Sequence, residues 1–330
     1  MTIKIKEPKR IVIDTDPGVD DAVAILLALK HPNLQVEALT TVAGNVDVEH
    51  TTTNALGILK LAGRSDIPVY RGADKPLERK TAHASDAHGD TGLGGVALDT
   101  EGVDTATGEA AQFIVDYTRE HPDEITLVPI GPLTNIAKAV TLDPSIVDRV
   151  PELVIMGGAE FTGNITPSAE FNFWYDPHAA DIVMRAGFKK ITMVGLDATS
   201  QAFMSPGTRD LLRRLQDPIA QFIYDITEEY ADFYWERRRL VGAELCDALA
   251  VAAMVDEAVL EFVDANVEIC VDGLCEGRSV VARTERYRDR TKNAAVGTRV
   301  DTKRFFELLL NTLFPEHEAE MAPIITHEYR

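Results

Sequence analysis

The sequence predicts an α/β fold, with one open, mainly parallel (mixed) sheet and helices on both of its faces. Short runs of β-branched and other apolar residues alternate with longer segments in which apolar residues recur at helical spacing. This alternation is typical of parallel strands joined by crossover helices. The chain has 330 residues, enough to bury a large core, and no internal repeat or low-complexity linker divides it. We therefore expect a single domain over residues 1–330.

Most of the predicted elements lie in the first two thirds of the chain. The expected strands, which are short and apolar, cover residues 10–16, 34–42, 68–70, 125–130, 153–156 and 191–194. The expected helices, some of which begin at acidic residues or end at glycine as helices commonly do, cover residues 20–30, 50–63, 110–121, 133–140 and 177–186.

The remaining segments are less regular. Residues 208–240 predict one or two long helices with a solvent-exposed face, residues 266–282 a β-hairpin, and residues 301–313 a closing helix. Residues 74–107 show no periodicity and are rich in Gly, Asp, Ala and His. A loop of that length inside a compact domain is usually functional or mobile.

The composition restricts the class of ligand. The chain has 53 acidic and 33 basic residues, and this formal net charge of −20 opposes binding to nucleic acids or anionic membranes, which require basic surfaces. Its three cysteines form no CxxC pair, so neither a disulfide framework nor a zinc ribbon is indicated. No run of about 18 apolar residues occurs, and residues 1–10 precede no apolar signal-peptide core. We expect a cytoplasmic protein that binds a small molecule.

The segment Asp14–Asp21, with the sequence DTDPGVDD, is the most informative motif. It places four carboxylates within eight residues, directly behind the apolar run Ile11–Ile13. Such crowding at the end of a buried strand is costly unless a cation is bound or a proton is shared. Hard carboxylate oxygens suit Ca²⁺ or Mg²⁺, although the twelfth-position Glu of an EF-hand loop is missing. A haloacid-dehalogenase-like phosphatase, with Asp14 as nucleophile and Asp16 as acid, is an alternative.

Other polar or glycine-containing segments also follow predicted strands. They are Gly44-Asn45, Ile130-Gly131-Pro132 and Gly157-Gly158. Because ligands bind at the carboxyl ends of the strands in open parallel sheets, we expect these loops to meet at one rim. Further along, residues 164–172 offer amides and a carboxylate that suit the hydroxyls of a sugar, although a structural loop explains them equally well.

Three more features are consistent with a site but also have structural explanations. His88 lies in a Gly-rich loop, and Cys246-Asp247 precedes an apolar helical face. Tyr230, Tyr234 and Arg238 share one helical face, because they are spaced at i, i+4 and i+8. A helix-capping aspartate, a small buried thiol and an ordinary amphipathic stripe are the competing interpretations.

In their order along the chain, these motifs resemble the signature of the inosine–uridine-preferring nucleoside hydrolases. The resemblance covers about residues 10–255 and rests on residues 14–22, 43–45, 88–89, 131–135, 156–158, 170–172 and 246–248. It implies a Rossmann-like nucleoside hydrolase fold and an N-ribohydrolase with one tightly bound Ca²⁺. It also implies a homodimer or homotetramer and a role in the salvage of bases and ribose.

The resemblance also implies a set of site residues. The calcium ligands would be Asp16, Asp21, the backbone carbonyl of Ile130, and Asp247, with Asp16 also acting as general base on water. The ribose 2′- and 3′-hydroxyls would complete the calcium shell. The substrate-binding residues would be Asp20, Asn45 and Asn172 at the 2′- and 3′-hydroxyls, Asn164 and Glu170 at the 5′-hydroxyl, Met156 in the ribose pocket, and Phe171 and Tyr234.

Cys246 departs from the pattern of many family members, which have a histidine before this aspartate that is thought to protonate the leaving base. A thiol with a reference pKa of ~8.5 is a weaker acid than imidazolium. The sequence therefore resembles the subgroup with cysteine here, and favours broad or pyrimidine-leaning ribonucleoside hydrolysis over a purine (inosine/guanosine) preference. His88, Cys246 or Arg238 are the candidates on the leaving-group side, with Tyr230 and Tyr234 beside them. A non-catalytic calcium- or sugar-binding protein is a third hypothesis, against which the intact Asp16 argues.

Overall fold

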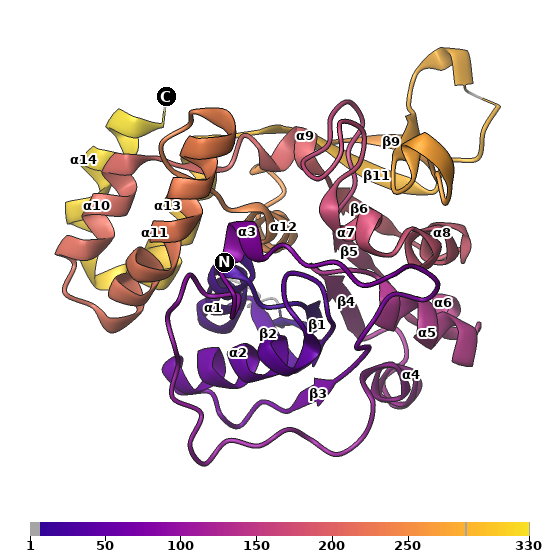
Figure 1. Ribbon diagram of the computed structural model, residues 1–330, viewed down its shortest axis with the longest axis horizontal. Coiled ribbons are helices and arrows are strands. Elements are labelled where there is room, and N and C mark those ends of the chain that lie inside the picture. The colour runs from indigo at the N-terminus through magenta and orange to yellow at the C-terminus, as the bar shows by residue number, and fades with distance from the viewer. Residues whose placement is uncertain (1–6, 288, 330) are drawn as a thin grey trace, which may run out of the picture.

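The computed structural model describes residues 7–287 and 289–329, and its centre is a nine-stranded sheet flanked by helices (Figure 1). The domain predicted over residues 1–330 and the segment 1–10 extend into residues outside this described part. The strand order is β10-β9-β11-β6-β5-β4-β1-β2-β3. The strands of the sheet are β1 (Lys9–Thr15), β2 (Leu34–Thr41), β3 (Val69–Arg71), β4 (Ile125–Pro129), β5 (Leu153–Met156), β6 (Ile191–Val194), β9 (Leu260–Ile269), β10 (Ser279–Ala282) and β11 (Ala294–Val300).

The sheet is mainly parallel and open, as predicted. Every pairing from β11 through β6, β5, β4, β1 and β2 to β3 is parallel, whereas β9 pairs antiparallel with both β11 and β10. The chain runs from β1 outward to β2 and β3, and then returns to place β4 on the other side of β1. Loops after β1 and β4 therefore leave in opposite directions, and this topological switch point is where ligands bind in such sheets.

Helices cover both faces of the sheet because successive strand residues point to opposite sides. Ile11 and Ile13 belong to a core shared with α1, α2 and α10–α14, whereas Val12 belongs to a second core formed with α4, α5 and α8. The helices are α1 (Val19–Lys30), α2 (Val48–Leu61), α3 (Ser85–His88), α4 (Ala110–Glu120), α5 (Thr134–Leu142), α6 (Ile146–Arg149), α7 (Phe171–Tyr175), α8 (Pro177–Arg185), α9 (Leu196–Thr199), α10 (Pro206–Arg214), α11 (Pro218–Arg238), α12 (Cys246–Val255), α13 (Thr302–Leu313) and α14 (Glu318–Glu328).

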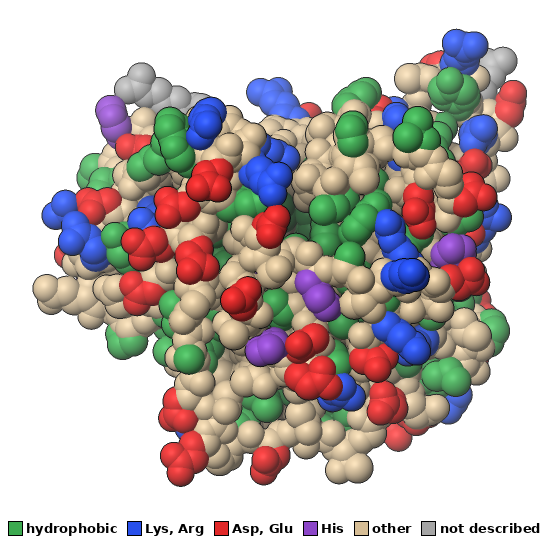
Figure 2. All heavy atoms as spheres, viewed as in Figure 1, with side chains coloured by type: hydrophobic (Ala, Val, Ile, Leu, Met, Phe, Trp, Pro, Cys, Tyr) green, Lys and Arg blue, Asp and Glu red, His purple; other side chains and the backbone are tan. Residues whose placement is uncertain are grey.

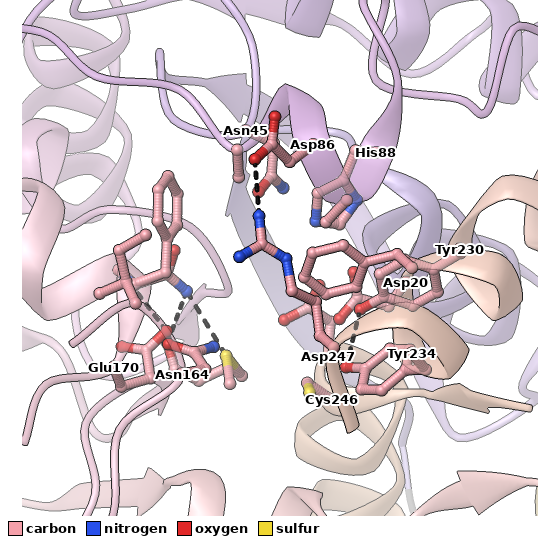
Figure 3. A pocket seen from close by; sticks show the side chains of 18 of the residues that line it. Asp20, Asn45, Asp86, His88, Asn164, Glu170, Tyr230, Tyr234, Cys246 and Asp247 are labelled. Atoms are coloured by element: carbon pink, nitrogen blue, oxygen red, sulfur yellow. Dashed lines mark hydrogen bonds and ion pairs between the residues drawn. The ribbon is translucent and has the colours of Figure 1, made fainter. Parts of the chain in front are cut away.

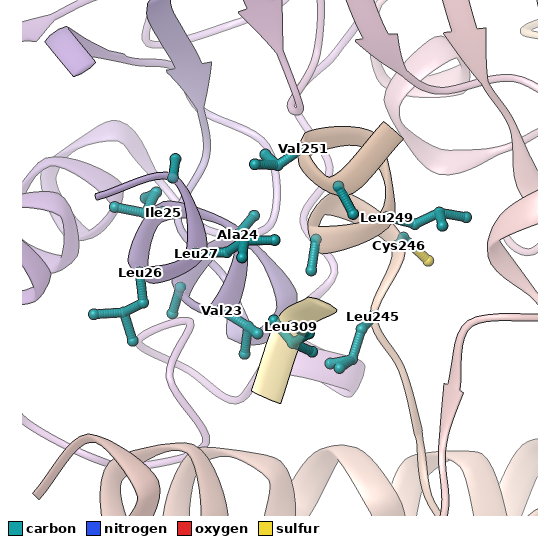
Figure 4. Close-up of a cluster of buried hydrophobic side chains, with 14 of the residues drawn as sticks. Val23, Ala24, Ile25, Leu26, Leu27, Leu245, Cys246, Leu249, Val251 and Leu309 are labelled. Atoms are coloured by element: carbon teal, nitrogen blue, oxygen red, sulfur yellow. The ribbon is translucent and has the colours of Figure 1, made fainter. Parts of the chain in front are cut away.

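Helices α1 and α12 pack side by side on the first face, although their sequences lie more than two hundred residues apart. Figure 4 shows Val23 and Leu27 of α1, Leu249 of α12 and Leu309 of α13 within one apolar cluster, and each of these side chains is at most 2% exposed. Burying one such side chain contributes about 1.5–3 kcal/mol. This packing fixes the N-terminal ends of α1 and α12 near each other, which matters for the acidic residues that they carry.

In its C-terminal third the structure confirms the predicted segments and adds elements that were not predicted. The segment predicted as one or two helices forms two, α10 and α11, separated at Gln216, whose φ is 54°. The hairpin predicted over residues 266–282 is the antiparallel pair of β9 and β10, in which Asn266 pairs with Ala282, and β9 extends back to Leu260. Strand β11 was missed because Ala and Gly have low strand propensity. Helix α14 was missed because it contains Pro323, a residue that normally ends a helix.

The segment 74–107 is irregular, as expected, apart from the single turn α3. It packs against the body of the protein through specific contacts. The backbone N–H of Leu77 donates to Asp176 at 2.9 Å, and the guanidinium of Arg79 lies 3.7 Å from the ring centre of Trp174. None of the helices in residues 7–287 and 289–329 combines the length and hydropathy that crossing a membrane requires.

Candidate active site

A pocket opens where the loops after β1, β4 and β5 meet the N-terminal ends of α1, α7 and α12. Figure 2 shows its mouth as a hollow near the middle of the molecule, with hydrophobic side chains inside it. Figure 3 shows Asn164 and Glu170 on one side of the pocket and Tyr230, Tyr234 and Cys246 on the opposite side. The position agrees with the rim that the sequence predicts.

Two helices bring together a cluster of carboxylates, of which Asp20 and Asp247 line the pocket. Asp20 and Asp21 lie in the first turn of α1, and Asp247 lies in the first turn of α12. One carboxylate oxygen from each approaches the others within 4.8 Å, and all three side chains are buried. The positive ends of two helix dipoles partly offset the repulsion. Burial, followed by the charge of Asp21, raises the pKa of Asp20 to about 8.

Asp16 extends this cluster from the end of β1 and has an unused oxygen. Its Oδ2 accepts the backbone N–H of Asn45 at 2.7 Å, whereas its Oδ1 has no hydrogen-bond partner within the described residues. Gly44 and Gly131 enclose it so closely that a Cβ atom at either position would lie 2.1 or 2.3 Å from an Asp16 oxygen. Burial and the charge of Asp21 raise its pKa well above the usual value. An orphaned, buried carboxylate oxygen of this kind fits a metal ligand.

Asp21 is oriented by hydrogen bonds from three neighbours. Thr15 Oγ1 donates to its Oδ1 at 2.6 Å, and the Gly18 N–H and Asn45 Nδ2 donate to its Oδ2 at 2.9 and 3.1 Å. Asn45 Nδ2 also donates to the backbone carbonyl of Asp16 at 3.2 Å. Asn45 therefore ties together the two carboxylates that the resemblance assigns to calcium.

The carbonyl of Ile130 faces the same region from the end of β4. It accepts a hydrogen bond from Asn172 Nδ2 at 3.0 Å, and Asn172 Nδ2 also contacts the carbonyl and the sulfur of Met156 at 3.2 and 3.4 Å. Carboxylates and a backbone carbonyl form a donor set of hard oxygens. Such a set suits Ca²⁺ better than a softer metal.

Glu170 forms the polar wall beside Asn172 and accepts hydrogen bonds from three backbone groups. It caps α7, accepting the N–H groups of Asn172, Gly158 and Phe173 at 2.8, 2.9 and 3.1 Å. Burial raises the pKa of Glu170 to about 7 despite these bonds. Asn164, which was expected beside it, lies on an exposed loop at the pocket mouth.

Aromatic and weakly polar side chains form the opposite wall. Tyr230 and Tyr234 project from α11 with ring centres 5.1 Å apart, and the Tyr230 ring lies 5.1 Å from that of His88. His88 Nδ1 accepts the N–H of Val19 at 3.1 Å, so the proton of the neutral imidazole resides on Nε2. Burial lowers the pKa of His88 to about 4 and raises that of the Cys246 thiol well above its usual value. Both groups are uncharged near neutral pH.

The pocket also has residues that were not predicted from the sequence. Phe233 and Arg237 lie on the same face of α11 as Tyr230 and Tyr234, at spacings of three and four residues, a signal that was available. His83, Asp86 and Ile165 come from irregular loops, and nothing in the local pattern identifies them. Glu244 lies just behind the aromatic wall. It contacts Arg238 and Cys246, which belong to different helices, so no local sequence pattern identifies it.

Asp14 is not part of the pocket. Its side chain is 1% exposed, and its Oδ1 accepts hydrogen bonds from Thr40 Oγ1 at 2.6 Å and Asn135 Nδ2 at 2.7 Å. Burial raises its pKa to about 7. Thr40 and Asn135 hold Asp14 behind Asp16, and Asp14 does not line the pocket. The phosphatase hypothesis therefore loses its catalytic residue.

The fold and the site together define a hydrolase class in which a carboxylate cluster, suited to a metal ion, lies beside a polar wall and an aromatic wall. Comparison with known proteins identifies that class. The model of the inosine-uridine preferring nucleoside hydrolase family matches residues 11–307. The chain belongs to this family, and it is therefore a hydrolase that acts on N-glycosyl bonds of nucleosides.

Individual relatives match this chain over nearly their whole length. The inosine-uridine preferring nucleoside hydrolase of Crithidia fasciculata is 39% identical over 93% of this chain and 98% of that protein. The pyrimidine-specific ribonucleoside hydrolase RihA of Shewanella baltica (strain OS185) is 39% identical over 92% and 96%. Among solved structures, a purine-preferring ribonucleoside hydrolase from Gardnerella vaginalis has a TM-score of 0.88 at 32% identity, covering 94% of this chain and 100% of that one.

Proposed function

We propose that this hydrolase cleaves ribonucleosides to ribose and free base at a Ca²⁺ site formed by Asp16, Asp21, the Ile130 carbonyl and Asp247. The observation that carries the proposal is the buried Asp16 Oδ1, which has no hydrogen-bond partner within the described residues. Burial and the charge of Asp21 raise the pKa of Asp16, and oxygens of Asp20, Asp21 and Asp247 lie within 4.8 Å of one another. A bound Ca²⁺ would compensate the clustered negative charge, make a nearby water molecule more acidic, and hold the ribose 2′- and 3′-hydroxyls.

The ribose is assigned to the polar half of the pocket. Asp20, Asn45 and Asn172 offer a carboxylate and two amides around the carboxylate cluster, where they would hydrogen-bond the 2′- and 3′-hydroxyls. Met156 is 4% exposed and would pack against the sugar. Glu170 would take the 5′-hydroxyl with a lone pair that its backbone donors leave free, and Asn164 would reach the same hydroxyl from the exposed loop.

In the proposed mechanism, Asp16 is the general base. Its Oδ1 would accept the proton of the water that attacks C1′, while the grip on the hydroxyls orients the sugar. The C1′–N bond would break through an oxocarbenium-like transition state, as in glycoside hydrolysis. The close approach of Gly44 and Gly131 leaves the Asp16 side chain little freedom, so this general base is already aligned before the substrate binds.

We assign the nucleobase to the aromatic half of the pocket. Tyr234 would contact the nucleobase from α11, and Phe171 would reach it from the start of α7, beside the polar wall. His88 Nε2–H would donate a hydrogen bond to it. Neither His88 nor Cys246 is charged near neutral pH, so neither resembles the imidazolium acid that many relatives use. This supports broad or pyrimidine-leaning specificity, because a departing pyrimidine depends less on protonation of a distant ring nitrogen than a purine does.

The test is ribose release from uridine, cytidine, inosine, guanosine and adenosine, each measured with calcium present and after chelation. We expect calcium-dependent release, with uridine or cytidine at least equal to inosine. A strong inosine and guanosine preference would instead favour the purine-preferring alternative. Absence of release from every riboside, with calcium restored, would leave a non-catalytic binding function.

Three wider properties are also proposed. The relatives match this chain over nearly their whole length, which supports one domain over residues 1–330. The acidic net charge of −20 supports a small-molecule substrate and no nucleic-acid or membrane partner. A homodimer or homotetramer, a cytoplasmic location and a role in nucleoside salvage follow from the family resemblance, and sedimentation and cell fractionation test the first two.

A further inference from the structure

We propose that Glu244 is a positioning residue that holds the guanidinium of Arg238 at the base end of the pocket, where it stabilises the negative charge of a departing pyrimidine. The inference rests on the proposed function, because it assigns the base to the aromatic half of the pocket. The substrate class is nucleosides whose base has a carbonyl oxygen next to the glycosidic nitrogen.

The carboxylate of Glu244 is unusually buried. Glu244 lies on the two-residue strand β8 (Ala243–Glu244), where it pairs with Phe203 of β7 (Phe203–Met204), and its side chain is 3% exposed. A buried carboxylate is costly without a cationic partner. Arg238 supplies that partner, since its Nη1 donates to Glu244 Oε1 at 2.8 Å. The pair therefore links the end of α11 to the segment that leads into α12.

Arg238 lines the pocket while its guanidinium is bound to Glu244 on the side away from the pocket. It lines the pocket with Tyr234, and its guanidinium carbon lies 5.8 Å from the centre of the Tyr234 ring. The bond to Glu244 uses Nη1, and a guanidinium has five N–H donors in a rigid planar fork. Donors therefore remain for a ligand in the pocket. The other carboxylate oxygen of Glu244 lies 4.0 Å from Cys246 Sγ, which is also a pocket residue.

The neighbouring arginines lack this arrangement. Arg237 pairs with Asp86 at 3.0 Å, but both side chains are largely exposed, at 63% and 77%. Arg239 lies at the left-handed end of α11, with a φ of 58°, and donates to the carbonyl of Trp235 at 3.1 Å. Of these three consecutive arginines, Arg238 is the one anchored by a buried carboxylate.

The chemistry suits a base that leaves as an anion. When the C1′–N1 bond of uridine breaks, both bonding electrons move to the base, and the negative charge spreads over N1 and the adjacent O2. Water supplies hydroxide to C1′ and its proton to Asp16. Arg238 transfers no proton, but its N–H groups stabilise the charge on O2, and solvent protonates the base after release. The arrangement replaces acid catalysis by electrostatic stabilisation.

The test compares two substrates in the full-length, calcium-loaded protein. Uridine needs help with its leaving group, whereas 4-nitrophenyl β-D-ribofuranoside has a leaving group that stabilises its own charge. We expect Arg238→Ala to lower kcat/KM for uridine by about 10²-fold, as loss of a transition-state donor does. Glu244→Gln should lower it by roughly 10- to 100-fold, as loss of an orienting partner does. Both variants should retain nitrophenyl riboside turnover within about threefold.

Two further variants separate positioning from a general structural role. In the Arg238→Ala background, adding Glu244→Gln should change uridine turnover less than twofold, because the effects of a coupled pair are not additive. Free guanidinium should rescue Arg238→Ala, and should fail to rescue the double variant. Arg239→Lys is the matched control on the same helix end and should leave both substrates unaffected. If Glu244→Gln does not fold, Glu244→Asp replaces it. Relative to the unmodified protein, Glu244→Asp should lose more turnover of uridine than of the nitrophenyl riboside.

The outcomes distinguish this inference from the proposed function. Equal losses on both substrates, or effects of the two substitutions that multiply, would overturn the role of Glu244 and Arg238. If the unmodified protein releases ribose from neither substrate, the proposed function itself fails. If it turns over both substrates and the variants match it, only the positioning role fails.

Discussion

The two halves of the pocket are built in different ways. The carboxylate and ribose half comes from strand ends and helix starts at the switch point of the sheet, and its members are held by short, buried bonds to backbone groups, as with Asp16 and Glu170. The base half comes from α11, α3 and β8, which contact each other through aromatic rings and one partly buried ion pair. Most members of the carboxylate half are therefore fixed by nearby strand ends, whereas the half that we propose for the base depends more on contacts between distant elements.

This difference explains how one fold serves several substrates. Relatives described as inosine-uridine preferring and pyrimidine-specific match the chain over more than 90% of its length at 39% identity. A purine-preferring relative has the same fold with a TM-score of 0.88. Loops and helix ends tolerate change better than the edge of a buried sheet does, so base preference can vary while the carboxylate cluster stays the same.

The largest effect should follow from removing the ribose 2′-hydroxyl, which the carboxylate half is proposed to bind. We expect kcat/KM to be about 10⁴-fold lower for 2′-deoxyuridine than for uridine, because the buried partners Asp20 and Asn172 stay unpaired. Competitive assays of ribose and deoxyribose release measure the ratio. The matched 5′-deoxyuridine should lose less, since Glu170 keeps its three backbone donors without that hydroxyl and Asn164 lies on an exposed loop. Equal turnover of uridine and 2′-deoxyuridine would refute this placement of the ribose.

The next effect concerns the general base. Asp16→Asn should lower kcat for uridine by roughly 10²- to 10⁴-fold at saturating calcium, because the amide cannot accept the proton of water. The loss should be similar for 4-nitrophenyl β-D-ribofuranoside, since attack by water is common to both substrates. A loss confined to uridine would place Asp16 on the base half, contrary to the structure.

A smaller effect should appear in the pH dependence of stability. The imidazole of His88 has a pKa of about 4 in the folded protein against 6.5 when unperturbed, so the unfolded chain binds more protons between those values. Stability therefore falls as the pH drops through this window, by about 2 kcal/mol between pH 7 and pH 5. His88→Asn, which retains an acceptor for the Val19 N–H, should remove that part of the decline in urea titrations with calcium present. Parallel pH profiles for the two proteins would contradict a buried, neutral imidazole.

The smallest effect concerns the stability of α11, the helix that carries most of the base half. Asp217 caps α11 by accepting the N–H groups of Ile219 and Ala220 at 2.7 and 3.0 Å. Asp217→Ala should lower the free energy of unfolding by ~1 kcal/mol. Activity on uridine at 25 °C should change less than twofold, because the cap lies at the end of α11 opposite to Arg238. A large drop in activity at unchanged stability would show that the base half is less firmly held than its packing indicates.

The sequence predicted that Asp16, Asp20 and Asp21 lie near one another, since they are close in the chain and follow a recognisable buried strand; their roles stay predictions. The structure brings Asp247 to them through the packing of α1 against α12. The base half was predicted in part from the helical spacing of Tyr230, Tyr234 and Arg238. Its remaining members could not be predicted, because Asp86 and Ile165 reach the pocket from loops whose path depends on distant contacts.

Strand β11 and helix α14 were missed for local reasons. Strand β11 gains its stability from its neighbours β6 and β9, which overcome the weak strand propensity of its Ala and Gly residues. Helix α14 tolerates Pro323 because Met321 and Ile325, on either side, are buried in the core. Tertiary packing overrides the local pattern in both cases.

The most direct test of the account is a calcium titration of the chelated protein, with bound calcium and ribose release from uridine measured on the same samples. We expect activity to rise in proportion to calcium occupancy and to saturate at one Ca²⁺ per chain, and we expect Asp247→Asn to weaken calcium binding and activity together. Full activity in the chelated protein, or calcium binding that Asp247→Asn leaves unchanged, would contradict a catalytic calcium site at this carboxylate cluster.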